Sequence, residues 1–561
     1  MSADVSFPVR ANLTRCLPYL VILVSGIGLY TPFASRFLYH TDSVGFALAI
    51  HNFDILKHQP GGPGYPLYVL ALRAVQFVTG STDNACIVTV SVLATIVSII
   101  LLYVLALTWM SRLEALITSL VVMTSPVVWF NAEVAMSYPV GMLGSVAVAL
   151  SCLRFIDGSV SARYLLPVVW GLSAGFRPDV GVMLLPLVIY TCRYEILSVR
   201  RYAPLMSVAA VVTVAAWLVP VIWITGGPLQ YFGRVHSAAA AISPLTFFRE
   251  GDISSGIGLM LKNIAVAVMF LGVGALGLLP VQATRLSKEM VRQRTDRVRA
   301  EHVTFLCVWF LPGFILDALT SVGHSGYILP YLPPFLMLLL TPFDKGRPYL
   351  EGRSGLSFQP RTAFLGVGIA LQSVFFLLAP QREGTLSGNW VSDTLLRTAA
   401  LEPTLSRIKR YDATIEGLVA EIKLSYPPDS TILLVPVGDE LPRNRPIRQL
   451  YGQGRYYLPE WEQRVLYTIP LAIFKRIGWQ GNAIASVHKD EFKLANTNIV
   501  AIPQHVRWLV WLFDADSSPY PFDTDWIKYS VGNGVHMVIG DMRAAQPRRW
   551  GPFEFKRSVN D

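Results

Sequence analysis

The chain has 561 residues, of which 53% are hydrophobic and 15% are charged, and its formal net charge is +10. A soluble globular domain carries about 25% charged residues, so a wholly soluble protein is excluded. The apolar residues gather in blocks of roughly 16–25, the length that a helix needs to cross a bilayer. The composition therefore predicts a mainly α-helical, multi-pass membrane protein.

The positive charge is compatible with nucleic-acid binding, but its distribution favours another interpretation. Most cations of the first 380 residues lie in loops between apolar blocks. Loops that stay in the cytoplasm carry such an excess of Lys and Arg. We therefore expect a membrane-lipid environment and no nucleic-acid partner.

Eleven apolar blocks are candidate membrane spans. They are residues 17–35, 85–109, 114–130, 138–154, 164–176, 179–192, 203–225, 257–281, 303–321, 327–343 and 362–380. The segment 66–80 is the doubtful one, because as a helix it reaches only about 22 Å and carries Arg73 and Gln76. If it does not span, the N-terminus and the basic loops 284–302 and 344–361 all face the cytoplasm. We therefore expect 66–80 to be an interfacial helix, with Arg73 directed towards lipid headgroups.

The chain divides into two expected domains. Residues 1–380 form the transmembrane domain, with a first outer loop at about 36–84, and residues 381–561 form a soluble extracytoplasmic domain. The second part shows one helical pattern, at 396–424. Strand patterns lie at 430–438, 497–503, 507–516 and 534–542. This mixture predicts a small α/β or α+β domain, and we expect the whole protein in the bacterial inner membrane.

Two carboxylates meet the same membrane face in this topology. Asp42 follows the first span, and Glu133 lies in SPVVWFNAEVAMSYP between two later spans. Each alone could be a helix-capping or turn residue. A pair of charges this close to hydrocarbon requires a reason, and a catalytic role is one.

Cationic and aromatic residues are expected on the same outer face. The group comprises Arg177 beside Asp179, Arg234, His236 and Arg249 in an outer loop, Lys262, and the junction residues His324 and Tyr327. A carboxylate can accept a proton from an incoming hydroxyl, and Arg or Lys can bind a phosphate leaving group. The pattern thus suits sugar transfer from an anionic lipid-borne donor.

Four motifs in residues 1–345 give the chain a family resemblance. They are TDS with Asp42, HQPGGPGYPLYVL from His58, SPVVWFNAEVAMSYP with Glu133, and GHSGYILPYLPP with His324 and Tyr327. With them the chain resembles GT-C glycosyltransferases close to family 39, which include protein O-mannosyltransferases and the aminoarabinose transferases. The PGYPLY stretch is similar to one subgroup. In contrast to the O-mannosyltransferases, Ser43 follows Asp42 where they have Glu, and Gln59 follows His58 in place of Pro.

The resemblance implies a polyprenyl-phosphate-linked sugar as donor and an acceptor that is a protein, lipid or glycan. It implies Asp42 as the catalytic base and Glu133 as a second site carboxylate, for acceptor positioning or a metal. Arg177 or a cation of 226–262, such as Arg234 or Lys262, is expected to bind the donor phosphate. A divalent metal stays open. The alternative function is a transporter or flippase of a lipid-linked or sugar substrate, which would place charges in mid-span.

Other singled-out residues have more ordinary interpretations. Asp54 is expected to be a solvated loop carboxylate, and Asp317 either faces the site or pairs with a neighbouring span. We expect membrane-interface anchoring of the aromatic residues Trp129, Phe130, Tyr138 and Tyr231. The acidic stretch 513–526 lacks the spacing of an EF-hand and is predicted to be a solvated loop.

Overall fold

The structure is a computed structural model. It describes residues 7–193, 196–249, 251–280, 297–320, 324–340, 360–379, 403–437, 450–467, 483–488, 491–495, 497–518, 520–543 and 548–558. The chain forms two compact units. We call residues 1–35, 49–381 and 395–407 the membrane unit, and residues 36–48, 382–394 and 408–561 the C-terminal unit.

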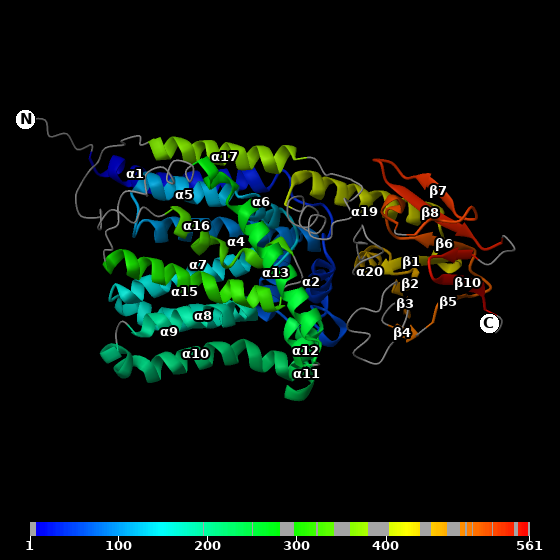
Figure 1. Ribbon diagram of the computed structural model, residues 1–561, viewed down its shortest axis with the longest axis horizontal. Coiled ribbons are helices and arrows are strands. Elements are labelled where there is room, and N and C mark those ends of the chain that lie inside the picture. The colour runs from blue at the N-terminus through cyan, green and yellow to red at the C-terminus, as the bar shows by residue number, and fades with distance from the viewer. Residues whose placement is uncertain are drawn as a thin grey trace, which may run out of the picture. The chain divides into compact units, whose positions relative to one another are not determined.

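The membrane unit is built from helices, most of which run side by side, with α11 and α12 lying crosswise at one end of them (Figure 1). In chain order they are α1 (Phe7–Tyr30), α3 (Pro66–Thr79), α4 (Asp83–Ala106), α5 (Arg112–Thr124), α6 (Pro126–Glu133), α7 (Tyr138–Ile156), α8 (Val160–Phe176), α9 (Pro178–Cys192), α10 (Ile196–Ile224), α11 (Pro228–Ile242), α12 (Pro244–Arg249), α13 (Ile253–Gly274), α15 (Arg297–Thr320), α16 (Leu332–Leu340) and α17 (Pro360–Leu378). Three short 3₁₀ helices join them: η1 (Ile55–Lys57), η3 (Leu276–Leu278) and η5 (Ser325–Ile328). The mainly helical membrane fold predicted from the sequence is confirmed.

Five helical stretches of the described residues are long and apolar enough to cross a bilayer. They are α4, α7, Tyr202–Ile224 of α10, Gly256–Gly274 of α13 and Glu301–Thr320 of α15. Other expected spans are present as shorter apolar helices, among them Cys16–Tyr30, Pro178–Cys192 and Ala363–Leu378. The expected span 114–130 is broken, because α5 and α6 meet at an angle of 60° where Ser125 precedes Pro126.

The segment 66–80 forms the separate short helix α3, which Pro66 begins and Gly80 ends with a left-handed φ of 62°. The expected direction of Arg73 is wrong. Its guanidinium Nε and Nη2 donate hydrogen bonds to the carbonyls of Ile50 and Ala49, at 2.8 and 2.9 Å. Arg73 thus satisfies the last carbonyls of a neighbouring helix, α2 (Thr41–His51), which otherwise lack partners.

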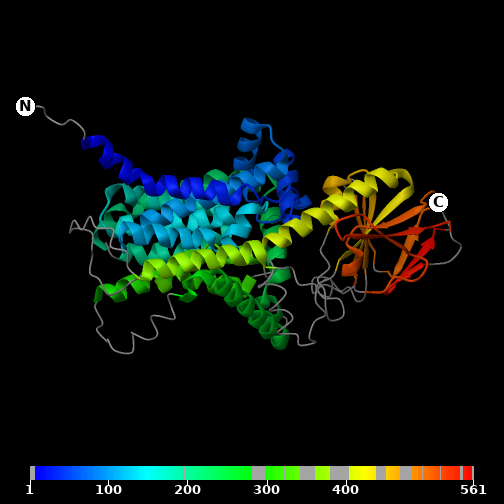
Figure 2. The same cartoon turned by 90° about the horizontal axis from the view of Figure 1, so that it is seen from above.

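The C-terminal unit contains two sheets and the helices α19 (Leu405–Ser425) and α20 (Tyr451–Tyr457) (Figure 2). The larger sheet has the order β4-β3-β2-β1-β6-β8-β7, and the smaller one has the order β5-β10-β9. The strands are β1 (Thr431–Val437), β2 (Glu462–Tyr467), β3 (Ala483–His488), β4 (Glu491–Ala495), β5 (Ile499–Ile502), β6 (Trp508–Trp511), β7 (Ile527–Ser530), β8 (His536–Asp541), β9 (Arg548–Trp550) and β10 (Phe553–Arg557).

The larger sheet contains both parallel and antiparallel pairs, and its parallel pairs are those of the central strand β1. Every residue of TILLVPV is buried, as expected for a strand covered on both faces, and β1 pairs in parallel with β2 and β6. The helix α19 packs Tyr411, Ile415 and Leu418 into the same core. The α/β character of this domain and the four predicted strands are therefore confirmed.

The segment Arg36–Leu48 belongs to the C-terminal unit, although it lies more than 350 residues earlier in the chain. Phe37 and Tyr39 pack against the core of this unit, and Leu38 is fully buried. Residues 36–84 are therefore shared between the two units, and Asp42 lies in the part that folds with the sheets.

Candidate functional site

Asp42 lies in the first turn of α2, where a carboxylate is favoured by the helix dipole. Its side chain is 56% exposed, and its Oδ2 lies 3.7 Å from Nδ1 of His40. The same nitrogen accepts a hydrogen bond from the Asp42 backbone N–H at 3.2 Å. Burial, together with the nearby Asp42 carboxylate, raises the pKa of Tyr451 on α20. Asp42 is thus an accessible carboxylate held on an ordered turn.

Glu133 has the opposite surroundings. Its side chain is fully buried, and its Oε1 accepts a hydrogen bond of 2.6 Å from the indole Nε1 of Trp129 one turn earlier. Its Oε2 has no hydrogen-bond partner among the described residues. The Glu133 backbone carbonyl accepts from the N–H of Ser35 at 2.9 Å. Glu133 therefore ties the end of α6 to the chain that leaves α1.

Arg177 lies between α8 and α9 and is buried. Its Nε and Nη2 donate to both carboxylate oxygens of Asp179, at 3.2 and 2.7 Å, and its Nη1 donates to Ser137 Oγ at 3.2 Å. Its guanidinium also lies over the rings of Tyr138 and Tyr65, at 4.8 and 5.8 Å. Such a bidentate pair with cation–π contacts leaves little of the charge for a ligand.

Tyr138, which lies under the Arg177 guanidinium, also contacts Tyr327, and Tyr327 in turn lies near His324. The ring centroids of Tyr138 and Tyr327 are 5.3 Å apart, and those of Tyr327 and His324 are 6.5 Å apart with nearly parallel ring planes. Gly326 permits this contact, because a Cβ there would overlap the ring of Tyr138. The structure thus brings together three of the predicted site residues, Arg177, His324 and Tyr327.

The Pro/Gly loop after η1 is held by α11. The Arg234 guanidinium forms a hydrogen bond with Nε2 of His58, and the Tyr231 hydroxyl donates to the Pro63 carbonyl at 3.1 Å. Partial burial lowers the pKa of Arg234. The predicted site residues His58 and Arg234 are therefore direct neighbours. At the start of η1, Asp54 accepts hydrogen bonds from the backbone of Leu56 and Lys57, and so caps this turn rather than being merely solvated.

Lys262 is half-buried on α13. Within the ranges that the structure describes, its ammonium group forms no ion pair or hydrogen bond. Asn263, its neighbour, is buried and donates to the Ala318 carbonyl of α15 at 3.1 Å. Packing thus fixes the helix that carries Lys262, and the charge of Lys262 is available to a ligand.

Two further buried carboxylates of the membrane unit have partners. Asp317 accepts a hydrogen bond from the hydroxyl of Tyr331, which favours the paired interpretation of this residue. Asp83 interacts with His51 Nε2 at 3.0 Å and accepts from Gln76 Nε2 at 2.8 Å. His51 therefore pairs with Asp83.

The expected interface aromatics are buried instead. Trp129, Phe130, Tyr138 and Tyr231 are each at most 5% exposed. Trp129 stacks on Phe376 of α17 with ring centroids 4.4 Å apart. The interface prediction is wrong for these residues, because they pack inside the protein: the Trp129 indole donates to Glu133 and the Tyr231 hydroxyl to the Pro63 carbonyl.

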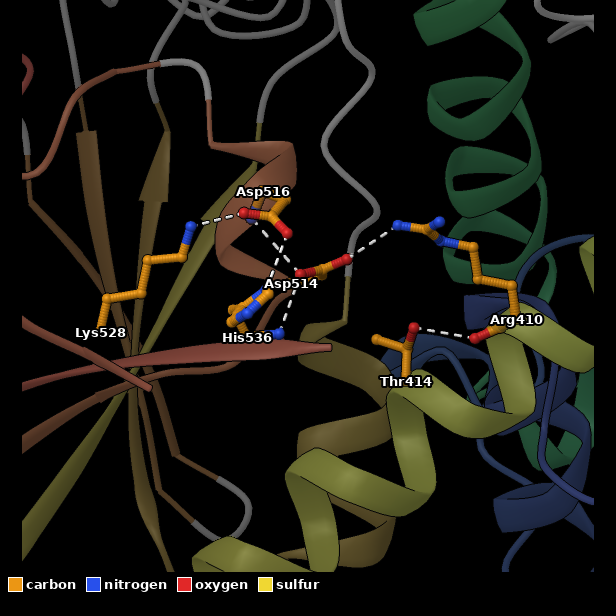
Figure 3. Close-up of polar contacts among 6 residues, drawn as sticks. All are labelled: Arg410, Thr414, Asp514, Asp516, Lys528 and His536. Atoms are coloured by element: carbon orange, nitrogen blue, oxygen red, sulfur yellow. Dashed lines mark hydrogen bonds and ion pairs between the residues drawn. The ribbon is translucent and has the colours of Figure 1, made fainter. Parts of the chain in front are cut away.

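A polar cluster in the C-terminal unit corrects the prediction for residues 513–526. Asp514 is buried and accepts from the backbone of Asp516 and His536 and from Arg410 of α19, at 3.3, 3.3 and 3.1 Å. Figure 3 shows Asp516 beside it, between Lys528 and His536, at 2.5 and 2.8 Å. The loop is thus braced rather than solvated at these positions.

The same cluster is a candidate for a metal by the type of its donors. Ligand atoms of Asp514, Asp516 and His536 lie within 4.8 Å of one another. Arg410 and Lys528 already neutralise the two carboxylates, and a divalent ion would have to displace these cations. The residues present therefore fit an internal ion-pair network better than a metal centre.

The contacts of several residues in these groups could not be foreseen from the sequence. Tyr65 and Ser137 lie inside two of the motifs and Tyr231 is one of the expected interface aromatics, but only the fold shows which groups they contact. Trp129 is different, because its separation of four residues from Glu133 places both on one face of a helix.

A comparison with solved structures finds several chains to which this fold is distantly similar. No family model and no curated protein matches the chain.

Two of the similar structures are of ArnT, the aminoarabinose transferase, from Cupriavidus metallidurans. The apo form shows 12% identity and a TM-score of 0.47, and covers 85% of this chain and 98% of its own. The form bound to undecaprenyl phosphate shows 11% identity and a TM-score of 0.45, with 86% and 98% covered. The oligosaccharyltransferase of Archaeoglobus fulgidus shows 14% identity and a TM-score of 0.43, with 86% and 74% covered. Likenesses at this level leave the function to be argued from the residues of this chain.

Proposed function

We propose that this protein is a membrane glycosyltransferase that moves a sugar from a polyprenyl-phosphate donor to an acceptor on the extracytoplasmic side, with Asp42 as the base. The observation that carries the proposal is the exposure of Asp42. Among four carboxylates singled out in the sequence of the membrane part, Glu133, Asp179 and Asp317 are buried or held by hydrogen bonds, whereas Asp42 is 56% exposed. It is the one that a substrate can reach.

The chemistry follows from that position. An acceptor hydroxyl attacks the anomeric carbon of the donor sugar and gives its proton to a carboxylate oxygen of Asp42. The bond between the anomeric carbon and the phosphate oxygen breaks, and polyprenyl phosphate leaves with the electron pair. A cation stabilises the charge that develops on the phosphate.

Lys262 and Arg234 are the cations that we assign to the donor phosphate. Arg177 is a weaker choice, because Asp179 already binds it through both oxygens. We assign Arg177, His324 and Tyr327 to holding the loop that carries Tyr65, and Glu133 to fixing the end of α6.

The test uses the purified full-length protein, labelled sugars on undecaprenyl phosphate, and a membrane extract as the source of acceptor. Transfer by Asp42→Asn should fall by about 10²- to 10⁴-fold, because the amide cannot accept the proton. Asp523→Asn changes an exposed carboxylate of the same unit and should transfer normally. Full activity of Asp42→Asn would exclude it as the base. If the wild type consumes no donor but flips labelled lipid in liposomes, the flippase function would be favoured instead.

Replacing Lys262 with Met should mainly weaken donor binding. The change keeps the length of the side chain and removes a charge that contacts the phosphate both before and during transfer, so KM for the donor should rise about 10-fold while kcat changes less. The measurement is initial rate against donor concentration. Lys423→Met, at an exposed position of α19, is the control. An unchanged KM would move the phosphate site away from Lys262.

A further inference from the structure

The chain just before Asp42 has no regular structure of its own. Residues 36–40 are irregular, and α2 begins only at Thr41. Backbone groups that enter a protein interior outside helices and strands must find other hydrogen-bond partners. Leu38 is fully buried, so its N–H and carbonyl groups show where those partners are.

Side chains of the C-terminal unit satisfy both backbone groups of Leu38. Its N–H donates to the Tyr457 hydroxyl at 2.9 Å. Its carbonyl accepts from the Tyr411 hydroxyl at 2.9 Å and from Gln453 Nε2 at 3.0 Å. Tyr457 and Gln453 belong to α20, and Tyr411 belongs to α19. A buried backbone that loses such partners is destabilised, so these three side chains define where Leu38 lies.

The side chains on both sides of Leu38 pack against the same two tyrosines that bind its backbone. The Phe37 ring meets Tyr457 edge-on at 5.6 Å, and the Tyr39 ring contacts Tyr411 at 4.7 Å. The residues that provide the hydrogen bonds therefore also fix the flanking side chains. The outer ion pair of Arg36 with Glu416 is largely exposed, and such pairs contribute little.

A short turn connects the anchored residue Leu38 to Asp42. The His40 N–H donates to Ser43 Oγ at 3.3 Å, and His40 Nδ1 accepts from the Asp42 N–H at 3.2 Å. Gly452 of α20 lies against this turn, with Thr41 3.4 Å from the position that a Cβ would occupy. From Leu38 to Asp42, alternate residues therefore have hydrogen-bonded backbone groups, namely Leu38, His40 and Asp42.

We infer that Tyr411, Gln453 and Tyr457 are positioning residues for Asp42, so that the C-terminal unit sets the place of the base in the reaction. The inference rests on the proposed function, because it needs Asp42 to be the base. Its physical reason is that small displacements of a catalytic group cost large factors in rate. Positioning of a base acts on kcat, whereas donor binding depends on other residues.

The test is the double variant Tyr411→Phe with Tyr457→Phe, which keeps both rings and removes both hydroxyls. We expect kcat to fall about 10-fold or more while KM for the donor stays within about twofold. Tyr529→Phe removes a comparable hydroxyl of the same unit, one that contacts Tyr426 and Glu421 instead, and should leave kcat unchanged. In the Asp42→Asn background the double change should alter the residual rate by less than about twofold, because the group being positioned is gone.

Amide hydrogen exchange of residues 36–44 gives a readout that needs no substrate. In the double variant these amides should exchange faster, while those of β1 and β6 keep their protection. Equal exchange in wild type and variant would overturn the inference, and so would a normal kcat in the double variant or an equal loss in the Asp42→Asn background. If Asp42→Asn itself transfers normally, the proposed base fails and the inference fails with it.

Discussion

Glu133 and Asp42 show how strongly surroundings separate two carboxylates that each lie at a helix end. Glu133 is buried against Trp129, whereas Asp42 is exposed in the first turn of its helix. The first can be tested through stability and the second through activity, because burial makes a lost hydrogen bond costly and exposure does not.

We expect Glu133→Ala to lower the unfolding temperature measured in detergent, and Glu133→Gln to stay close to wild type. Alanine leaves the buried Trp129 N–H without an acceptor, at a cost of about 1–3 kcal/mol, whereas glutamine keeps an acceptor oxygen. Tryptophan fluorescence during heating reports both. Equal unfolding temperatures of the two variants would show that the Trp129 hydrogen bond contributes nothing.

Asp516 predicts an acid-dependent loss of stability in the C-terminal unit. Hydrogen bonds from Lys528 and then His536 lower the pKa of Asp516 below its ordinary value of 3.8. A lowered carboxyl pKa contributes stability that is complete above the ordinary value and is lost as the pH falls through the folded-state value. Below about pH 5, unfolding of wild type should thus show a steeper pH dependence than that of Asp516→Asn.

Thermal unfolding from pH 6 to pH 2.5 measures this difference. Asp523→Asn, at an exposed carboxylate that forms no ion pair within the described part of the chain, is the matched control and should follow wild type. The same pH dependence in Asp516→Asn and wild type would assign the acid sensitivity to other groups.

At the scale of elements, close backbone approach decides how α17 packs. A Cβ at Gly368 would overlap the carbonyl oxygen of Gly277 in η3, and a backbone atom cannot move aside as a flexible side chain can. Gly366, two residues earlier on the same helix, has nothing within 4 Å of the corresponding position. Alanine substitutions at these two glycines therefore distinguish the effect of packing from the effect of helix propensity.

Gly368→Ala should sharply reduce the yield of monodisperse protein in size-exclusion chromatography. Gly366→Ala should not, because alanine is the better helix former by about 1 kcal/mol where space allows it. Normal yield and thermal stability of Gly368→Ala would mean that α17 can shift away from η3 without cost.

Elements with a strong local pattern were predictable from the sequence, and elements fixed by distant contacts were not. A continuous apolar run indicates β1, and an amphipathic helical period indicates α19. The helix α20, YGQGRYY, is only seven residues long and has two glycines, so its pattern carries no such signal. Its partner Leu38 lies 419 residues from Tyr457, a separation over which one sequence offers no periodicity.

Candidate site residues followed the same rule. The expected topology singled out Arg177, Asp179 and Arg234, and a motif singled out His58; the fold makes Arg177 a neighbour of Asp179, and His58 a neighbour of Arg234. Neither the topology nor the motifs showed that Asp42 belongs with residues 408–561, because that depends on the hydrogen bonds of an irregular segment. The expected domain boundary near residue 380 was drawn from composition. Composition does not reveal that a short segment, here residues 36–48, folds with a distant part of the chain.

For the whole molecule, the orientation in the membrane is a prediction from charge. The basic loop at 284–302 should face the cytoplasm and the C-terminal unit should face the opposite side. In a cysteine-free background, Thr524→Cys should react with a membrane-impermeant maleimide in intact cells. Ser287→Cys should react only after the membrane is disrupted. The reverse pattern would invert the topology and remove the extracytoplasmic assignment.

The placement of Leu38 also has a consequence for synthesis of the protein. A ribosome adds about 5–20 residues per second, so Tyr457, 419 residues later, emerges roughly 20–80 s after Leu38. Until then the segment around Asp42 lacks the side chains that satisfy its backbone, although the first helices can already have entered the bilayer. The segment around Asp42 can therefore reach its final structure only after Tyr457 has been synthesised.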